Sequence, residues 1–154
     1  MKKQGFTLIE LMVVIVIMGI LAAVAVPKLF GMIAKSKASE VPTAAGTWIN
    51  LLDAYAAEKS EIGNWEAIGY EAPGVVASTK SSSHTNVINY TSTGTNGSTW
   101  TATPVNALNE CTTSMNWSLT ATATATNVTV ADASTGTACK ALTPNWSGLL
   151  RSSN

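Results

Sequence analysis

The hydrophobic residues are concentrated near the N-terminal end of the chain. No residue from Leu11 to Val26 has a polar side chain, and extending the run back to Phe6 adds only Thr7 and Glu10 as interruptions. The 21 residues 6–26 would form a helix about 31 Å long at 1.5 Å per residue, which matches the ~30 Å hydrocarbon core of a bilayer. We predict a membrane-spanning helix here. The buried helix of a soluble protein is the alternative, but no face of this run is polar.

The residues around this apolar run set its orientation. Lys2 and Lys3 precede it without an accompanying acid, so the positive-inside rule places the N-terminus in the cytoplasm and the rest of the chain across the membrane. A secretory signal peptide is the main rival interpretation, with Ala23–Ala25 as its small-residue cleavage site. Glu10 argues against that interpretation, because it puts a carboxylate at the start of the apolar stretch.

A second helical pattern follows the first. Apolar residues recur at three- and four-residue spacing, which predicts an amphipathic helix with one face to pack; they are Ala45, Trp48, Ile49, Leu52, Tyr55 and Ala56. Pro27 and Pro42 each remove a helical hydrogen bond, because proline has no N–H to donate. We therefore predict one long bent helix from Phe6 to about Lys59.

The remainder of the chain changes to extended patterning. Turn signals within residues 63–74 predict a packed connecting loop. Segments 86–92 and 98–105 flank an Asn-Gly turn, which predicts a β-hairpin. From Trp117 to Ala125 apolar residues alternate with Ser and Thr, as in a half-buried strand; residues 127–131 either continue this strand or form another. An antiparallel sheet results.

These elements together predict an α+β fold, in which the sheet packs on the second half of the long helix. We expect a hydrophobic membrane segment at 6–30 and a globular head at 31–154. Within the head we expect the helix to continue over 31–60, a loop at 61–85 and the sheet region at 86–154.

Composition narrows the class of function. The chain has nine basic and nine acidic side chains, and a net charge of zero gives no argument for a nucleic-acid partner. One histidine and two cysteines are too few ligands for a typical structural zinc site. No constellation of catalytic residues and no Gly-rich phosphate loop is recognisable. We predict a structural protein, neither an enzyme nor a binder of a metal or cofactor.

The most specific signal is the string GFTLIE, from Gly5 to Glu10, followed by the apolar run. This string resembles the prepilin-type N-terminal signature of type IV pilins and their pseudopilin relatives, and the chain looks like a type IVa-like major pilin. The resemblance implies that a prepilin peptidase cuts between Gly5 and Phe6, so that residues 1–5 are a leader peptide. It also implies N-methylation of the new Phe6 amine.

Glu10 has a physical role that fits this resemblance. A carboxylate within the bilayer costs roughly 2.5–3.5 kcal/mol at the middle of a helix on insertion scales, and an acid there suggests a function and a partner. The natural partner is the Phe6 amine that processing creates. The resemblance implies that Glu10 pairs with this amine on a neighbouring subunit and sets the register of assembly. The alternative is that Glu10 lies at the headgroup boundary.

Gly19 and Pro27 mark a weak stretch of the helix. Pro27 leaves the carbonyl of Ala23 without its helical donor, and glycine has a low helix propensity. The resemblance implies that this stretch bends or melts when the helix packs into a filament core. A simple kink in an intact helix is the alternative.

Cys111 and Cys139 are the only cysteines. A head outside the cytoplasm meets an oxidising environment, so we expect a disulfide, although two free thiols remain the alternative. The bond would stabilise the fold by roughly 3–4 kcal/mol in the chain-entropy model. Many type IV pilins have such a C-terminal disulfide loop.

The resemblance implies a subunit that polymerises with copies of itself into a type IV pilus, for adhesion, twitching motility and DNA uptake. Its other partners would be the prepilin peptidase, the inner-membrane assembly platform and the assembly and retraction ATPases. It would span the inner membrane before assembly and then lie in the cell-surface filament. The alternatives are a major pseudopilin of a type II secretion system, a minor pilin, and a secreted Ser/Thr-rich binding domain.

Overall fold

The computed structural model describes residues 5–124 and 127–152. The chain divides into two compact units, Met1–Ile33 and Ala34–Asn154. Residues 1–4 of the expected leader peptide lie outside the described residues. So does Ala125, which was expected at the end of a strand.

The first unit consists of most of helix α1 (Leu8–Ala38). The helix is continuous through Gly19 and Pro27. All side chains from Gly5 to Phe30 are exposed, which follows from an apolar surface on every side of the helix and no packing partner within this unit. The helix is long and apolar enough to cross a membrane, as the sequence pattern predicts.

Helix α2 (Glu40–Lys59) follows α1 after a break at Ser39. The break has a cause in the sequence, because Pro42 cannot donate to the carbonyl four residues earlier, that of Ala38. Proline is tolerated in the first turn of a helix, where the N–H groups have no helical partner anyway. The amphipathic pattern is confirmed: Val41, Ala44, Ala45, Trp48, Ile49, Leu52 and Ala56 are buried.

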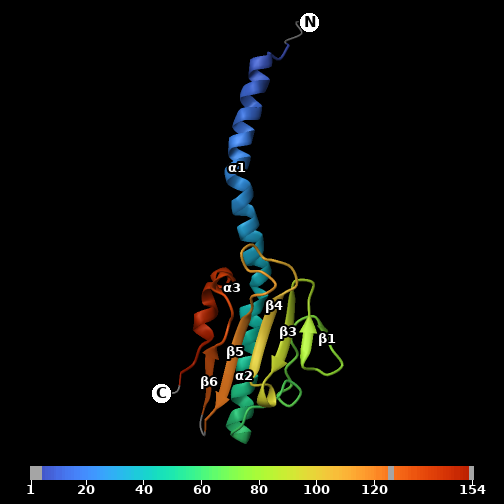
Figure 1. Cartoon of the computed structure of the whole chain (residues 1–154), viewed down its shortest axis with the longest axis vertical. Coiled ribbons are helices and arrows are strands. Elements are labelled where there is room, and N and C mark those ends of the chain that lie inside the picture. The colour runs from blue at the N-terminus through green and yellow to red at the C-terminus, as the bar shows by residue number, and fades with distance from the viewer. Residues whose placement is uncertain (1–4, 125–126, 153–154) are drawn as a thin grey trace. The chain divides into compact units, whose positions relative to one another are not determined.

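The second unit also contains a six-stranded antiparallel sheet in the order β1-β2-β3-β4-β5-β6 (Figure 1). Its strands are β1 (Val75–Val76), β2 (Ser82–His84), β3 (Ile88–Thr93), β4 (Thr99–Pro104), β5 (Trp117–Ala123) and β6 (Val128–Asp132). The chain ends with the short helix α3 (Thr137–Leu142) and the 3-10 helix η2 (Pro144–Leu149). The predicted α+β fold class is confirmed.

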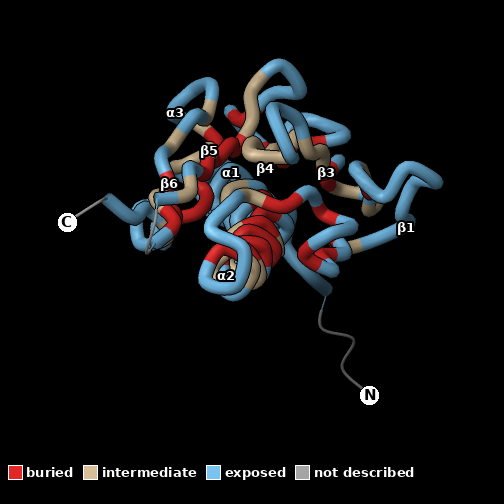
Figure 2. The backbone as a smooth tube through the Cα atoms, turned by 90° about the horizontal axis from the view of Figure 1, so that it is seen from below, coloured by how far each residue is buried: buried red, intermediate tan, exposed pale blue. Residues whose placement is uncertain are grey.

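The core lies between α2 and one face of the sheet. Figure 2 shows the buried backbone of α2 beside the strands, and the ring centroids of Trp48 on α2 and Trp100 on β4 are 6.5 Å apart. The connecting loop closes onto this core through Tyr70, whose hydroxyl donates to the Ala44 carbonyl at 3.0 Å and accepts from the indole of Trp100 at 3.0 Å. Burial raises the pKa of Tyr70.

The sheet is larger than the sequence pattern indicated. The predicted hairpin is β3 and β4, joined by the 3-10 turn η1 (Thr95–Gly97), and 128–132 forms a separate strand, β6, paired with β5. Strands β1 and β2 lie within 61–85, where the sequence analysis expected loop. Two- and three-residue strands are too short to show an alternating pattern. His84, the single histidine of the chain, is exposed and belongs to β2.

Candidate functional site

The N-terminal motif forms the start of α1. Gly5 to Thr7 are not helical, and Phe6 is 84% exposed. The bond between Gly5 and Phe6 therefore lies in a non-helical, accessible segment just before the first helical turn. A protease requires access of this kind to the backbone it cuts, and Gly5 adds no side chain beside the bond.

Glu10 is held by Thr7, a residue that the sequence analysis left without a role. The carboxylate Oε2 of Glu10 accepts hydrogen bonds from the Thr7 backbone N–H at 2.8 Å and from its hydroxyl at 2.6 Å. The backbone N–H of Glu10 donates to the Thr7 hydroxyl at 3.4 Å. This reciprocal arrangement is a capping box, and its sequence signature, a Thr followed three residues later by Glu, was present in GFTLIE.

The capping box leaves Glu10 available to another chain. Only Oε2 is occupied by Thr7, and the side chain is exposed. The carboxylate is also near the positive end of the helix dipole, which favours a negative charge there. Thr7 thus fixes the orientation of the Glu10 carboxylate. The other carboxylate oxygen, Oε1, can pair with a cation.

An exposed apolar surface surrounds Glu10. Phe6, Ile9, Val13 and Val14 line a hollow with Glu10 on its wall, and the apolar side chains continue along the helix to Ile33, which is 42% exposed. A soluble monomer rarely exposes a continuous apolar patch of this extent. The first unit is therefore suited to lipid or to packing against other helices.

Gly19 and Pro27 lie within the unbroken helix α1. No heavy atom outside the neighbouring backbone lies within 4 Å of where a Cβ on Gly19 would be, so close packing within the chain does not explain this glycine. Melting of this stretch on assembly stays a prediction.

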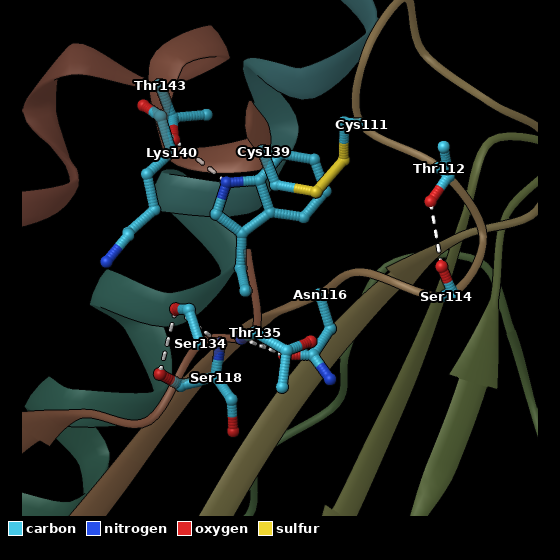
Figure 3. Close-up of a disulfide and its surroundings, with 11 residues drawn as sticks. Cys111, Thr112, Ser114, Asn116, Ser118, Ser134, Thr135, Cys139, Lys140 and Thr143 are labelled. Carbon is cyan, nitrogen blue, oxygen red and sulfur yellow. Dashed lines mark hydrogen bonds between the residues drawn. A yellow bond between two sulfur atoms is a disulfide. The ribbon is translucent and has the colours of Figure 1, made fainter. Parts of the chain in front are cut away.

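Cys111 and Cys139 form a disulfide, as expected. Figure 3 shows this disulfide, which joins the segment between β4 and β5 to α3. Both cysteines are fully buried. Beside it, the indole of Trp117 donates to the Thr143 hydroxyl at 2.9 Å. The bond therefore fixes the C-terminal helices of the head to the loop that precedes β5.

Asp132 is a second anchor of the C-terminal segment. Its Oδ2 pairs with Lys140 Nζ at 2.6 Å, and its Oδ1 accepts from the Ser134 backbone N–H at 3.0 Å and from the Trp146 indole at 3.2 Å. Burial opposes ionisation, but the donors, Lys140 first among them, outweigh it and lower the pKa of Asp132 to about 2. Sequence reasoning missed this hub because its partners meet only through the fold of the C-terminal chain.

Comparison with known proteins gives a family signal at the N-terminus. Residues 1–26 match the family model described as the prokaryotic N-terminal methylation motif. The chain is 49% identical over 59 residues to the type IV major pilin protein PilA of Myxococcus xanthus, a match that covers 38% of this chain and 24% of that protein.

Two further relatives extend the comparison. Identity to the fimbrial protein EcpC of Eikenella corrodens is 39% over 86 residues, or 56% of this chain and 53% of that protein. Identity to the type II secretion system core protein G of Vibrio cholerae is 46% over 59 residues, or 38% of this chain and 40% of that protein. The chain thus spans about half the length, or less, of the curated relatives it matches. These findings confirm the resemblance to type IV pilins and the prediction of a structural protein.

Proposed function

We propose that this chain, which carries the N-terminal methylation motif and resembles type IV pilins, is the major structural subunit of a type IV pilus. The observation that carries the proposal is the exposed apolar surface of α1 with Glu10 at its start. Such a surface is stable in a bilayer and also in a bundle of identical helices, so one element serves the membrane-bound subunit and the filament.

Processing creates the charge that assembly needs. A prepilin peptidase cuts between Gly5 and Phe6, and the new Phe6 amine is methylated. This amine pairs with the Glu10 carboxylate of a neighbouring subunit, where the lipid-like surroundings strengthen the attraction. Thr7 supports the pairing, because its two hydrogen bonds hold the carboxylate in place before the neighbour arrives. Gly19 and Pro27 allow the helix to extend as it packs.

The remaining partners and roles follow from the same proposal. The subunit first spans the inner membrane and then enters the cell-surface filament, by way of an assembly platform and the assembly and retraction ATPases. The filament supports adhesion, twitching motility and DNA uptake. Relatives named as major pilins and fimbrial proteins support this proposal.

Loss of the gene tests the proposal. A strain without this chain should show no filaments by electron microscopy of the sheared surface fraction, and the wild-type gene should restore them. Restoration with Glu10→Gln should give many fewer filaments, while the processed subunit still accumulates in the membrane. Filaments that persist in the strain lacking the chain would show that it is not the major subunit.

A major pseudopilin is the second candidate function, favoured by the similarity to core protein G. By family resemblance, major pseudopilins usually carry a calcium-binding C-terminal loop and no disulfide. Here Asp132, the only Asp after residue 60, is occupied by Lys140, Ser134 and Trp146, and the disulfide is present. A defect in protein secretion with normal surface filaments, in the strain lacking the chain, would favour the pseudopilin.

A further inference from the structure

Charge is segregated along the processed chain. Residues 6–38 contain three lysines and one glutamate, whereas residues 39–74 contain six acidic side chains and one lysine. The rest of the chain, residues 75–154, is nearly balanced, with three basic and two acidic side chains. The end of α1 is therefore basic, and α2 with its following loop is acidic.

The lysines of α1 are free to meet another molecule. Lys28, Lys35 and Lys37 are exposed, and none of them forms an ion pair in the described part of the chain. Lys28 and Lys35 are seven residues apart, about two helical turns, so they share one face of the helix. Lys37 is nine residues from Lys28, about two and a half turns, and lies on the opposite face.

A groove of about 370 Å³ lies between the start of α2 and the loop that precedes β1. Ser39, Thr43 and Thr47, four residues apart along the chain, line one side of it, and Tyr70 and Glu71 line the other. The hydroxyls of Ser39 and Thr47 donate to the carbonyls of Ser36 and Thr43 at 2.6 and 3.1 Å, so that their oxygens can still accept a hydrogen bond. The groove is mostly apolar, with Glu40 on its wall. It therefore suits a long aliphatic side chain that ends in a cation, such as lysine.

Glu40 is a carboxylate fixed in position without a cation. Its Oε1 accepts from the Tyr90 hydroxyl at 2.9 Å and from the Thr85 hydroxyl at 3.1 Å. Neither Glu40, which is half-buried, nor the exposed Glu71 forms an ion pair among the described residues. A prepositioned carboxylate loses little entropy when a partner binds, and a bond to an ammonium group is charge-assisted.

We infer that this groove receives the Lys28/Lys35 face of a second copy of the chain. A lysine ammonium group of that second copy lies between Glu40 and Glu71. The hydroxyl oxygens of Ser39, Thr43 and Thr47 accept its remaining hydrogen bonds. This inference rests on the proposed polymer, because only a filament holds many copies side by side. It adds a second register-setting contact to the one at Glu10, outside the membrane segment.

Cross-linking of intact filaments tests the inference directly. Filaments grown from a mixture of light and heavy isotope-labelled subunits are treated with a carbodiimide, which joins an amine to a carboxylate that it touches. Mass spectrometry should find light–heavy peptide pairs joining Lys28 or Lys35 to Glu40 or Glu71. Pairs found only within one isotope class would place the contact within a subunit and overturn the inference.

Charge reversal provides the functional test. Glu71→Lys should reduce the yield of sheared filaments several-fold, and the matched control Glu110→Lys, another exposed acid without a described ion pair, should not. Lys28→Glu or Lys35→Glu should reduce the yield and partly restore it when combined with Glu71→Lys. Lys37→Glu, on the opposite face, should change the yield little.

The two proposals fail in different ways. Wild-type filaments that contain this chain, with an equal yield for Glu71→Lys and Glu110→Lys, would overturn the groove contact and leave the pilus subunit intact. Absence of the chain from any wild-type filament would overturn both. A fluorescence melt of each variant in detergent shows whether the head is folded, and Glu71 makes no described hydrogen bond whose loss would unfold it.

Discussion

The two units of this chain use apolar residues in opposite ways. Between Leu8 and Ile33 the large apolar side chains are exposed, whereas those of α2 and the inner face of the sheet are buried. Leu21 is 64% exposed and Leu52 is fully buried, although both are leucines in the middle of an α-helix. The difference teaches that the head completes its own core, while the partner of the first unit lies outside the chain.

The disulfide should contribute strongly to the stability of the head and not to that of the first unit. Replacing both Cys111 and Cys139 by Ser should lower the free energy of unfolding of the head by roughly 3–4 kcal/mol. The bond joins residues 28 positions apart, and in the chain-entropy model it stabilises the fold because it reduces the conformational entropy of the unfolded chain. Urea unfolding of the detergent-solubilised chain, followed by tryptophan fluorescence, measures this, since all five Trp lie between residues 48 and 146. A head equally stable without the bond would contradict the account.

Substitution of one leucine in each unit tests the difference between them. Leu52→Ala should destabilise the head by about 2–5 kcal/mol, because it leaves a cavity in a packed core. Leu21→Ala should not change the same unfolding curve, because Leu21 is exposed and does not belong to the head's core. The comparison would break if both variants shifted the urea midpoint equally.

Asp132 gives a smaller and pH-dependent effect. Asp132→Asn should cost about 1.5–3 kcal/mol, the usual contribution of hydrogen bonds to a charged group. The folded-state pKa of about 2 lies below the ordinary value of 3.8, so the contribution is complete above about pH 5 and is lost as the pH falls toward 2. Urea unfolding at a series of pH values should show the wild type losing stability over that window. The Asn variant should lose less there, and equal losses would contradict this role.

Parts of the molecule with a strong local pattern were predictable from the sequence. GFTLIE and the apolar run indicated the first unit, the spacing of Trp48 and Leu52 indicated α2, and the Asn96-Gly97 turn indicated the β3–β4 hairpin. Each of these signals is read within a few residues, by period or by turn chemistry. The pairing of the two cysteines followed from their being the only two.

Features that depend on distant segments were not predictable. Asp132 becomes a hub only because α3 and η2 bring Lys140 and Trp146 to it. The position of the Glu40 carboxylate depends on a hydrogen bond from Tyr90, 50 residues away. Thr7 is the exception, since its cap was readable from the motif and was overlooked.

The intact mass of the protein in a sheared surface fraction tests the central claim most directly. The account predicts an abundant chain that begins at Phe6, carries one added methyl group and is two hydrogens lighter than the reduced form because of the Cys111–Cys139 bond. A chain that begins at Val26 would show cleavage by signal peptidase and would contradict it. So would a correctly processed chain that is found in the cell envelope and never in the sheared filaments.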